Sequence, residues 1–195
     1  RRALQNIALS YLMLSGKPEV VAACVEQFED ADNMTERLTA LAVLVNSGFE
    51  AERAKALASF AERFKDNPLV MDQWFSVQAG NTQPGGLERI QHLMQHPAFT
   101  LKNPNKVRAL IGAFANQNLV NFHRADGAGY RFLADQVIVL NKLNPQIASR
   151  LLAPLTRWRK YDVSRQGLMK TELERILASG ELSSDVYEVV SKSLA

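Results

Sequence analysis

The chain has 195 residues, of which 47% are apolar and 22% charged; these proportions are typical of a folded globular protein and exclude a disordered chain. Its 23 Lys and Arg are interleaved with 20 Asp and Glu, so the net charge of +3 predicts no broad surface of one sign and does not favour a nucleic-acid partner. No run of about 18 apolar residues occurs, so we expect no membrane-spanning helix.

The N-terminal segment indicates where the protein works and how complete the chain is. Cys24 is the single cysteine, which excludes an internal disulfide, and no signal peptide is visible; we therefore expect a reducing, cytoplasmic location. Residues 1–15 begin without Met and already have the spacing of an apolar helix face. That face comprises Leu4, Ile7, Ala8 and Tyr11. We expect that this helix is already under way at residue 1, and therefore that the chain is a fragment of a longer protein.

Start and stop signals predict the next three helices. Gly16 and Pro18 precede a helix over 18–29. Asn33, with Glu36 three residues later, predicts a capping box for a helix that ends at Gly48, and a helix over 50–64 follows. The expected apolar faces are Val21, Cys24, Val25 and Phe28; Leu38, Leu41, Ala42 and Val45; and Leu57, Phe60, Ala61 and Phe64.

Three later helices share the start signal Asn-Pro, at Asn67-Pro68, Asn103-Pro104 and Asn144-Pro145. Asn caps the exposed amides, and Pro takes the first helical position, where its missing N–H costs nothing. The starts lie 36 and 41 residues apart, close to the roughly 40-residue period of HEAT and armadillo arrays, although no side-chain pattern repeats. We predict an irregular superhelical stack of antiparallel helix pairs, an α-solenoid.

The longest loop signal is residues 79–86 (AGNTQPGG), which separates the helix after Asn67 from one at 87–95. A stretch of this length suits a connector at least as well as a boundary, so we predict a single domain over 1–195. Further helices are expected from Pro104 and over 130–143, 163–179 and 184–194, the second of these in a central position. No segment alternates with period two, so the predicted fold class is all-α.

Several motifs contain the residue types of a metal-binding or nucleic-acid-binding site. His92 and His96 have the spacing of two zinc-binding imidazoles, but no Glu follows His92 and Pro97 ends the helix, so a surface pair is favoured; His123 has no ligand-type partner at suitable spacing. Residues 157–161 (RWRKY) interleave cations and aromatics as RNA-binding segments do, yet a helix C-terminus attracts the same cations. Residues 126–129 (DGAG) lack a preceding strand and indicate an interhelical turn.

The helix begun by Pro145 carries the pattern with most functional content. Gln146, Arg150 and Arg157 follow one polar face, and Pro154 should bend the helix because it cannot donate to the carbonyl of Arg150. Two interpretations remain open at this point. The stripe is either a binding wall placed at a kink or a solvated face with a tolerated proline.

Four segments together resemble the C-terminal helical domain of the bacterial aminopeptidase N family, the M1 zinc-dependent aminopeptidases. They are 31–35 (ADNMT), 122–130 (FHRADGAGY), 144–151 (NPQIASRL) and the ending 187–195. The likeness covers essentially the whole chain. It implies a parent enzyme that removes N-terminal residues from peptides, using a zinc site and an exopeptidase motif in an upstream catalytic domain.

Neither the HExxH motif nor the GAMEN motif of that domain occurs here, so no catalytic residue or metal ligand carries over and no cofactor is expected in this fragment, which should be inactive alone. The resemblance implies a lid that closes over the catalytic cavity and restricts access, with the catalytic domain and peptides as partners. It also implies that Arg150 points toward bound peptide. Gln146, one turn earlier on the same helix face, is a weaker candidate for the same role. The rivals are a free-standing helical-repeat scaffold and an RNA-binding solenoid.

Overall fold

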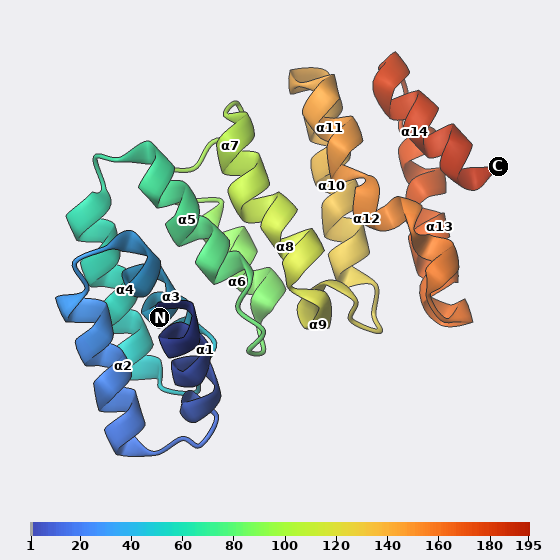
Figure 1. Cartoon of the computed structure of the whole chain (residues 1–195). Helices are drawn as coiled ribbons and strands as arrows, with labels where there is room; N and C mark the ends of the chain where they lie inside the picture. The colour runs from blue at the N-terminus through green and yellow to red at the C-terminus, as the bar shows by residue number, and fades with distance from the viewer. Residues whose placement is uncertain (1) are drawn as a thin grey trace. The chain divides into compact units, whose positions relative to one another are not determined.

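The computed structural model describes residues 2–195, so Arg1, at the start of the first predicted helix, lies outside the described residues. Within them all regular elements are helical and no strand occurs, which confirms the all-α prediction (Figure 1). The contacts group into two compact units, Arg1–Gln83 and Pro84–Ala195. The division between them falls in the sequence stretch 79–86; the single domain stays a prediction. No helix in the described part of the chain is long and apolar enough to cross a membrane.

The first unit is organised around α3 (Met34–Val45), which packs against α1 (Arg2–Met13), α2 (Pro18–Asp30), α4 (Glu50–Phe64) and α5 (Pro68–Ala79) (Figure 1). Because neighbours surround it, α3 buries more than one stripe. Ala40 and Leu44 are fully buried, whereas Leu38 and Ala42, which the spacing assigned to the apolar face, are only partly buried. The face predicted for α3 is therefore wrong at those two positions.

Two polar contacts fix the entry to α3. Asn33 accepts the backbone N–H of Glu36 at 3.0 Å, so the predicted N-cap is confirmed. The Glu36 carboxylate accepts from the Asn33 side-chain amide at 2.8 Å, a contact that takes the place of the backbone N–H bond of a standard capping box. Arg37, which is buried, donates to the carbonyls of Phe28 and Ala31 and satisfies orphan acceptors at the end of α2. No sequence signal pointed to the contacts of Arg37.

The second unit contains α6 (Gly86–Leu93), a rod made of α7 (Pro104–Val107), the π-helical η1 (Arg108–Gly112) and α8 (Ala113–Gln117), and then α9 (Leu119–Phe122). The central α10 (Ala128–Leu143) follows, and then α11 (Pro145–Leu151), α12 (Ala153–Thr156) and the 3₁₀ turn η2 (Trp158–Lys160). The unit ends with α13 (Val163–Leu177) and α14 (Ser184–Leu194). Helix α10 packs against α9, α11 and α13, as its central position predicts.

The three Asn-Pro starts are confirmed. Asn67 accepts the N–H of Val70 at 3.3 Å, and Asn144 accepts that of Ile147 at 3.1 Å. Asn103 uses a nearer donor, the N–H of Asn105, at 2.9 Å. Each Pro occupies the first helical position, so the signal marked the true start of α5, α7 and α11.

The glycine-rich turn before α10 is set by packing geometry. Gly127 has φ +68° and forms the N-cap of α10, a conformation that side chains rarely adopt. A Cβ at Gly129 would overlap the carbonyl oxygen of Phe122, so only glycine lets α9 and α10 approach this closely. The interhelical-turn interpretation is confirmed.

Gly129→Ala should therefore destabilise the chain by about 3 kcal/mol, since overlap with a backbone carbonyl must be relieved by moving a helix. Gly167→Ala is the matched control: Gly167 lies in α13 with nothing within 4 Å of an added Cβ. That change should stabilise by about 0.5–1 kcal/mol. Urea unfolding measures both, and equal effects at the two glycines would refute the steric account.

Candidate functional site

The short helix α11 presents the predicted site. Asn144 caps its start with Pro145 at the first position, and the helix ends at Leu151, where Leu152 N–H turns back to Ser149 O at 3.3 Å. Pro154 lies in the first turn of α12. The predicted bend coincides with a one-residue break between α11 and α12 at Leu152, whose backbone stays in the helical region, because Pro154 offers no N–H to the carbonyl of Arg150. Helix α11 packs against α10 and α14.

Arg150 and Gln146 lie one turn apart on α11, and both are exposed. Neither side chain makes a hydrogen bond or ion pair with the residues that the structure describes, so five guanidinium donors face solvent at Arg150. Arg157 lies beyond the end of α12, and the prediction that it continues the same helical face is wrong. Of the predicted polar stripe, Gln146 and Arg150 therefore share a helix face, and Arg157 lies apart from them.

A second candidate surface lies on α1. Leu4, Ile7 and Tyr11 are 72%, 55% and 71% exposed, whereas the face turned to α2 and α3 buries Asn6, Leu9 and Met13. The spacing identified an apolar face, and that face is turned away from its own unit. Large apolar side chains exposed side by side mark a surface that another part or partner covers.

His123 joins three elements through its ring and its backbone carbonyl. Its Nδ1 lies 2.8 Å from the hydroxyl of Tyr130 and its Nε2 3.0 Å from that of Tyr161, while Arg165 donates to its carbonyl at 3.0 Å. Burial and the nearby Arg165 lower the pKa of His123, and burial raises the pKa of Tyr130 to about 12. With both ring nitrogens engaged, His123 ties α9, α10 and the start of α13 together; sequence spacing could not show this.

The RWRKY segment is used for packing. Trp158 Nε1 and an Arg159 guanidinium nitrogen both donate to the carbonyl of Ser193, at 3.1 and 2.8 Å. The guanidinium of Arg159 lies 4.3 Å from the Trp158 ring centroid. These groups therefore cap the C-terminus of α14. The cations do lie at a helix C-terminus, as one interpretation of RWRKY expected, but the helix is α14 and not the one that precedes the segment.

The remaining titratable candidates are accounted for by local contacts. His96 Nδ1 accepts the N–H of Ala98 at 3.1 Å, and His92 is exposed. Cys24 is fully buried, and burial raises its pKa to about 11, as expected for a packed thiol. Within residues 2–195, no three or more His, Cys, Asp or Glu side chains gather where they could hold a metal ion. A zinc site does not fit these residues.

The geometry agrees with the comparisons to known proteins. The model of one family, described as "Domain of unknown function (DUF3458_C) ARM repeats", matches residues 1–195, so the chain belongs to this ARM-repeat family. The predicted armadillo-like class is confirmed.

The chain is also similar to proteins named aminopeptidase N. It is 42% identical over 193 residues to that of Haemophilus influenzae and 43% over 194 residues to that of Caulobacter vibrioides, covering 99% and 100% of this chain. It spans 22% of the length of each relative. The crystal structure of Legionella pneumophila aminopeptidase A in complex with aspartic acid superposes with a TM-score of 0.93 at 38% identity, over 99% of this chain and 23% of that one. The resemblance to the helical domain of aminopeptidase N is confirmed.

We expect the imidazole of His123 to titrate with a pKa below the ordinary value of about 6.5, because its half-buried site disfavours a charge beside Arg165. The unfolded chain then binds the proton more readily, so this residue's contribution to the free energy of unfolding is present above about pH 6.5 and lost as the pH falls below it. An NMR titration, with His123→Gln to assign the resonance, measures the pKa. A value at or above 6.5 would contradict the burial argument.

Proposed function

We propose that this chain is the C-terminal lid domain of an M1 zinc-dependent aminopeptidase that removes N-terminal residues from peptides. In this proposal the domain closes over the catalytic cavity, restricts access and supplies Arg150 to position the substrate, but contributes no catalytic residue and is inactive alone. The observation that carries the proposal is an exposed arginine, unpaired among residues 2–195, on a helix whose start and end are both fixed. The similarity to proteins named aminopeptidase N supports the enzyme class.

Arg150 suits a positioning role because of its chemistry. A guanidinium donates two parallel hydrogen bonds to a carboxylate, or one to a peptide carbonyl, and stays charged at every physiological pH. Gln146, one turn earlier, offers a neutral amide to the same substrate chain. Holding the C-terminal side of a short peptide fixes its scissile bond relative to catalytic groups without any bond chemistry at Arg150.

The exposed face of α1 supports a large contact with the rest of the parent chain. The relatives are several times longer than this chain, which spans 22% of their length, and Leu4, Ile7 and Tyr11 are the kind of side chains that an adjoining domain covers. We propose that the catalytic domain is this partner, that it holds the zinc ion, and that the whole enzyme is cytoplasmic.

Arg150→Ala in the parent enzyme should reduce kcat/KM for tripeptides about tenfold, which corresponds to losing one charge-assisted hydrogen bond of roughly 1.5 kcal/mol. The kcat/KM for single-residue amides should stay within about twofold, since these substrates have no C-terminal carboxylate to hold. Arg150→Lys should give an intermediate loss because it keeps the charge without the planar fork. Steady-state kinetics on matched tripeptide and amide substrates measures the difference.

Arg157→Ala is the matched control, since it removes the same charge from an exposed side chain beyond the helix interruption. It should leave both substrate classes unchanged. The proposal fails if Arg150→Ala leaves tripeptide cleavage intact, or if both substitutions lower it equally.

A further inference from the structure

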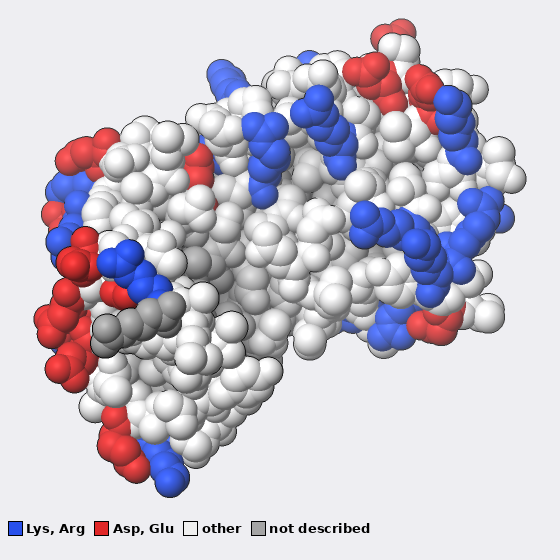
Figure 2. Space-filling view, viewed as in Figure 1, with Lys and Arg blue, Asp and Glu red and all other residues white. Residues whose placement is uncertain are grey.

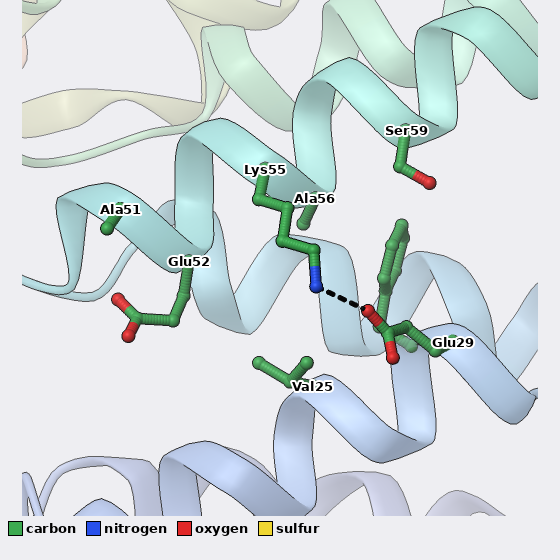
Figure 3. A pocket seen from close by; sticks show the side chains of 8 residues that line it. Val25, Glu29, Ala51, Glu52, Lys55, Ala56 and Ser59 are labelled. Carbon is green, nitrogen blue, oxygen red and sulfur yellow. Dashed lines mark hydrogen bonds and ion pairs between the residues drawn. The ribbon is translucent and has the colours of Figure 1, made fainter.

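An apolar hollow with an acidic rim lies between α2 and α4 in the first unit (Figure 3). It has a volume of about 260 Å³, with a floor of Val25, Phe28 and Ala56 and a rim that includes Glu29, Glu52 and Lys55. Ala51, Ala56 and Ser59 are small, so α4 leaves the space that larger side chains would fill. The small side chains of α4 therefore keep the hollow open.

A second hollow of about 490 Å³ shares Val25, Glu29 and Glu52 with the first and continues along α2 toward Phe49. We refer to both together as the α2–α4 groove. The two hollows together give room for more than one side chain of an extended guest, whose successive residues are about 3.3 Å apart. The groove is lined within one unit and needs no residue of the other.

The charges around the groove are strongly one-sided. Glu26, Glu29, Asp30 and Glu52 line it, against Lys55 as the single cation among the lining residues described. No hydrogen bond or ion pair with the described residues engages the carboxylates of Glu26, Asp30 or Glu52. Figure 2 shows several acidic side chains along the edge where α2 and α4 lie in Figure 1, with some Lys and Arg side chains among them.

This local excess agrees with the charge of the whole unit. Residues 1–83 contain eight Lys and Arg against eleven Asp and Glu, a net charge of −3, while residues 84–195 contain fifteen against nine, a net charge of +6. The net charge of +3 for the whole chain is therefore the sum of an acidic first unit and a basic second unit. An anionic guest, including nucleic acid, would be repelled from the groove.

We propose that the α2–α4 groove binds a short basic peptide segment, in which a branched apolar side chain enters the hollow and flanking Lys or Arg side chains reach the carboxylates. The apolar floor supplies the burial, and the carboxylates supply charge complementarity and select against acidic segments. The groove lies in a different unit from Arg150, so the inference does not depend on the proposed function.

Lys55 pairs with one of the carboxylates that line the groove. Its Nζ lies 3.0 Å from a carboxylate oxygen of Glu29, across the hollow (Figure 3), and the two side chains are 74% and 49% exposed. An ion pair this exposed contributes little stability. An incoming cation must share Glu29 with Lys55, so removing Lys55 should strengthen binding. Damage to the fold would only weaken binding, so tighter binding after removal of Lys55 would identify a specific effect on the groove.

The test is a fluorescence-anisotropy titration of the parent chain with an N-acetylated, C-terminally labelled five-residue peptide of alternating Lys and Leu. Acetylation removes the free N-terminus that an aminopeptidase requires. Glu52→Gln should weaken binding two- to fivefold and Lys55→Gln should tighten it by a similar factor. Ala51→Trp, which fills the hollow, should weaken it at least tenfold. Peptides with Glu for Lys, or Ser for Leu, should not bind measurably.

Matched controls lie on the same helix. Glu50→Gln removes the same charge from an 85%-exposed side chain outside the groove, and Ala54→Trp adds the same bulk at an exposed position outside it. Both should bind like the unmodified chain, and circular dichroism should show equal helix content in all variants. The proposal is overturned if the Lys-Leu peptide fails to bind, if Glu50→Gln matches Glu52→Gln, or if sedimentation shows that a second copy of the chain fills the groove.

Discussion

Pro145 and Pro154 determine the helix on which the functional proposal depends. A helix as short as α11 is not stable by itself, because nucleation costs more than so few hydrogen bonds return. Asn144 satisfies an amide at its start, Ile147 and Leu151 bury its inner face, and Pro154 prevents its extension. These constraints fix the backbone under Arg150 while its side chain stays without a partner among the described residues. A rigid base with an unengaged guanidinium is the arrangement that substrate positioning requires.

Local signals predicted this fold well, whereas predictions that depend on tertiary neighbours were less reliable. Asn-Pro starts and the Asn33 N-cap act within one turn of helix, so the sequence contains all the partners. The buried face of a helix depends on what packs against it. The apolar face of α1 is therefore turned to solvent, and α3 buries Ala40 and Leu44 because helices surround it.

The candidate site shows the same limit. Exposure of Arg150 and Gln146 followed from their positions opposite the buried face of α11, which the 3.6-residue period gives directly. The link from His123 to Tyr161 joins residues 38 positions apart, and spacing carries no information about such a contact. The α2–α4 groove was missed for a related reason: a hollow arises from small residues on one helix facing a neighbour, and neither helix alone shows it.

The two units differ in their charge and in the surfaces that they carry. The acidic unit carries the exposed apolar face of α1 and the groove, and the basic unit carries Arg150 and the His123 cluster. Burial of the α1 face would attach the domain, while Arg150 would contact what the parent enzyme binds. Attachment and substrate positioning then rest on different residues, so each is open to separate mutation.

The most direct test of the central claim is a crystal structure of the parent enzyme with a bound, non-hydrolysable tripeptide analogue. The account predicts that the guanidinium of Arg150 lies within hydrogen-bond distance, about 2.7–3.2 Å, of the carbonyl or terminal carboxylate on the C-terminal side of the peptide. A structure in which Arg150 faces bulk solvent, away from the cavity that holds the peptide, would contradict it.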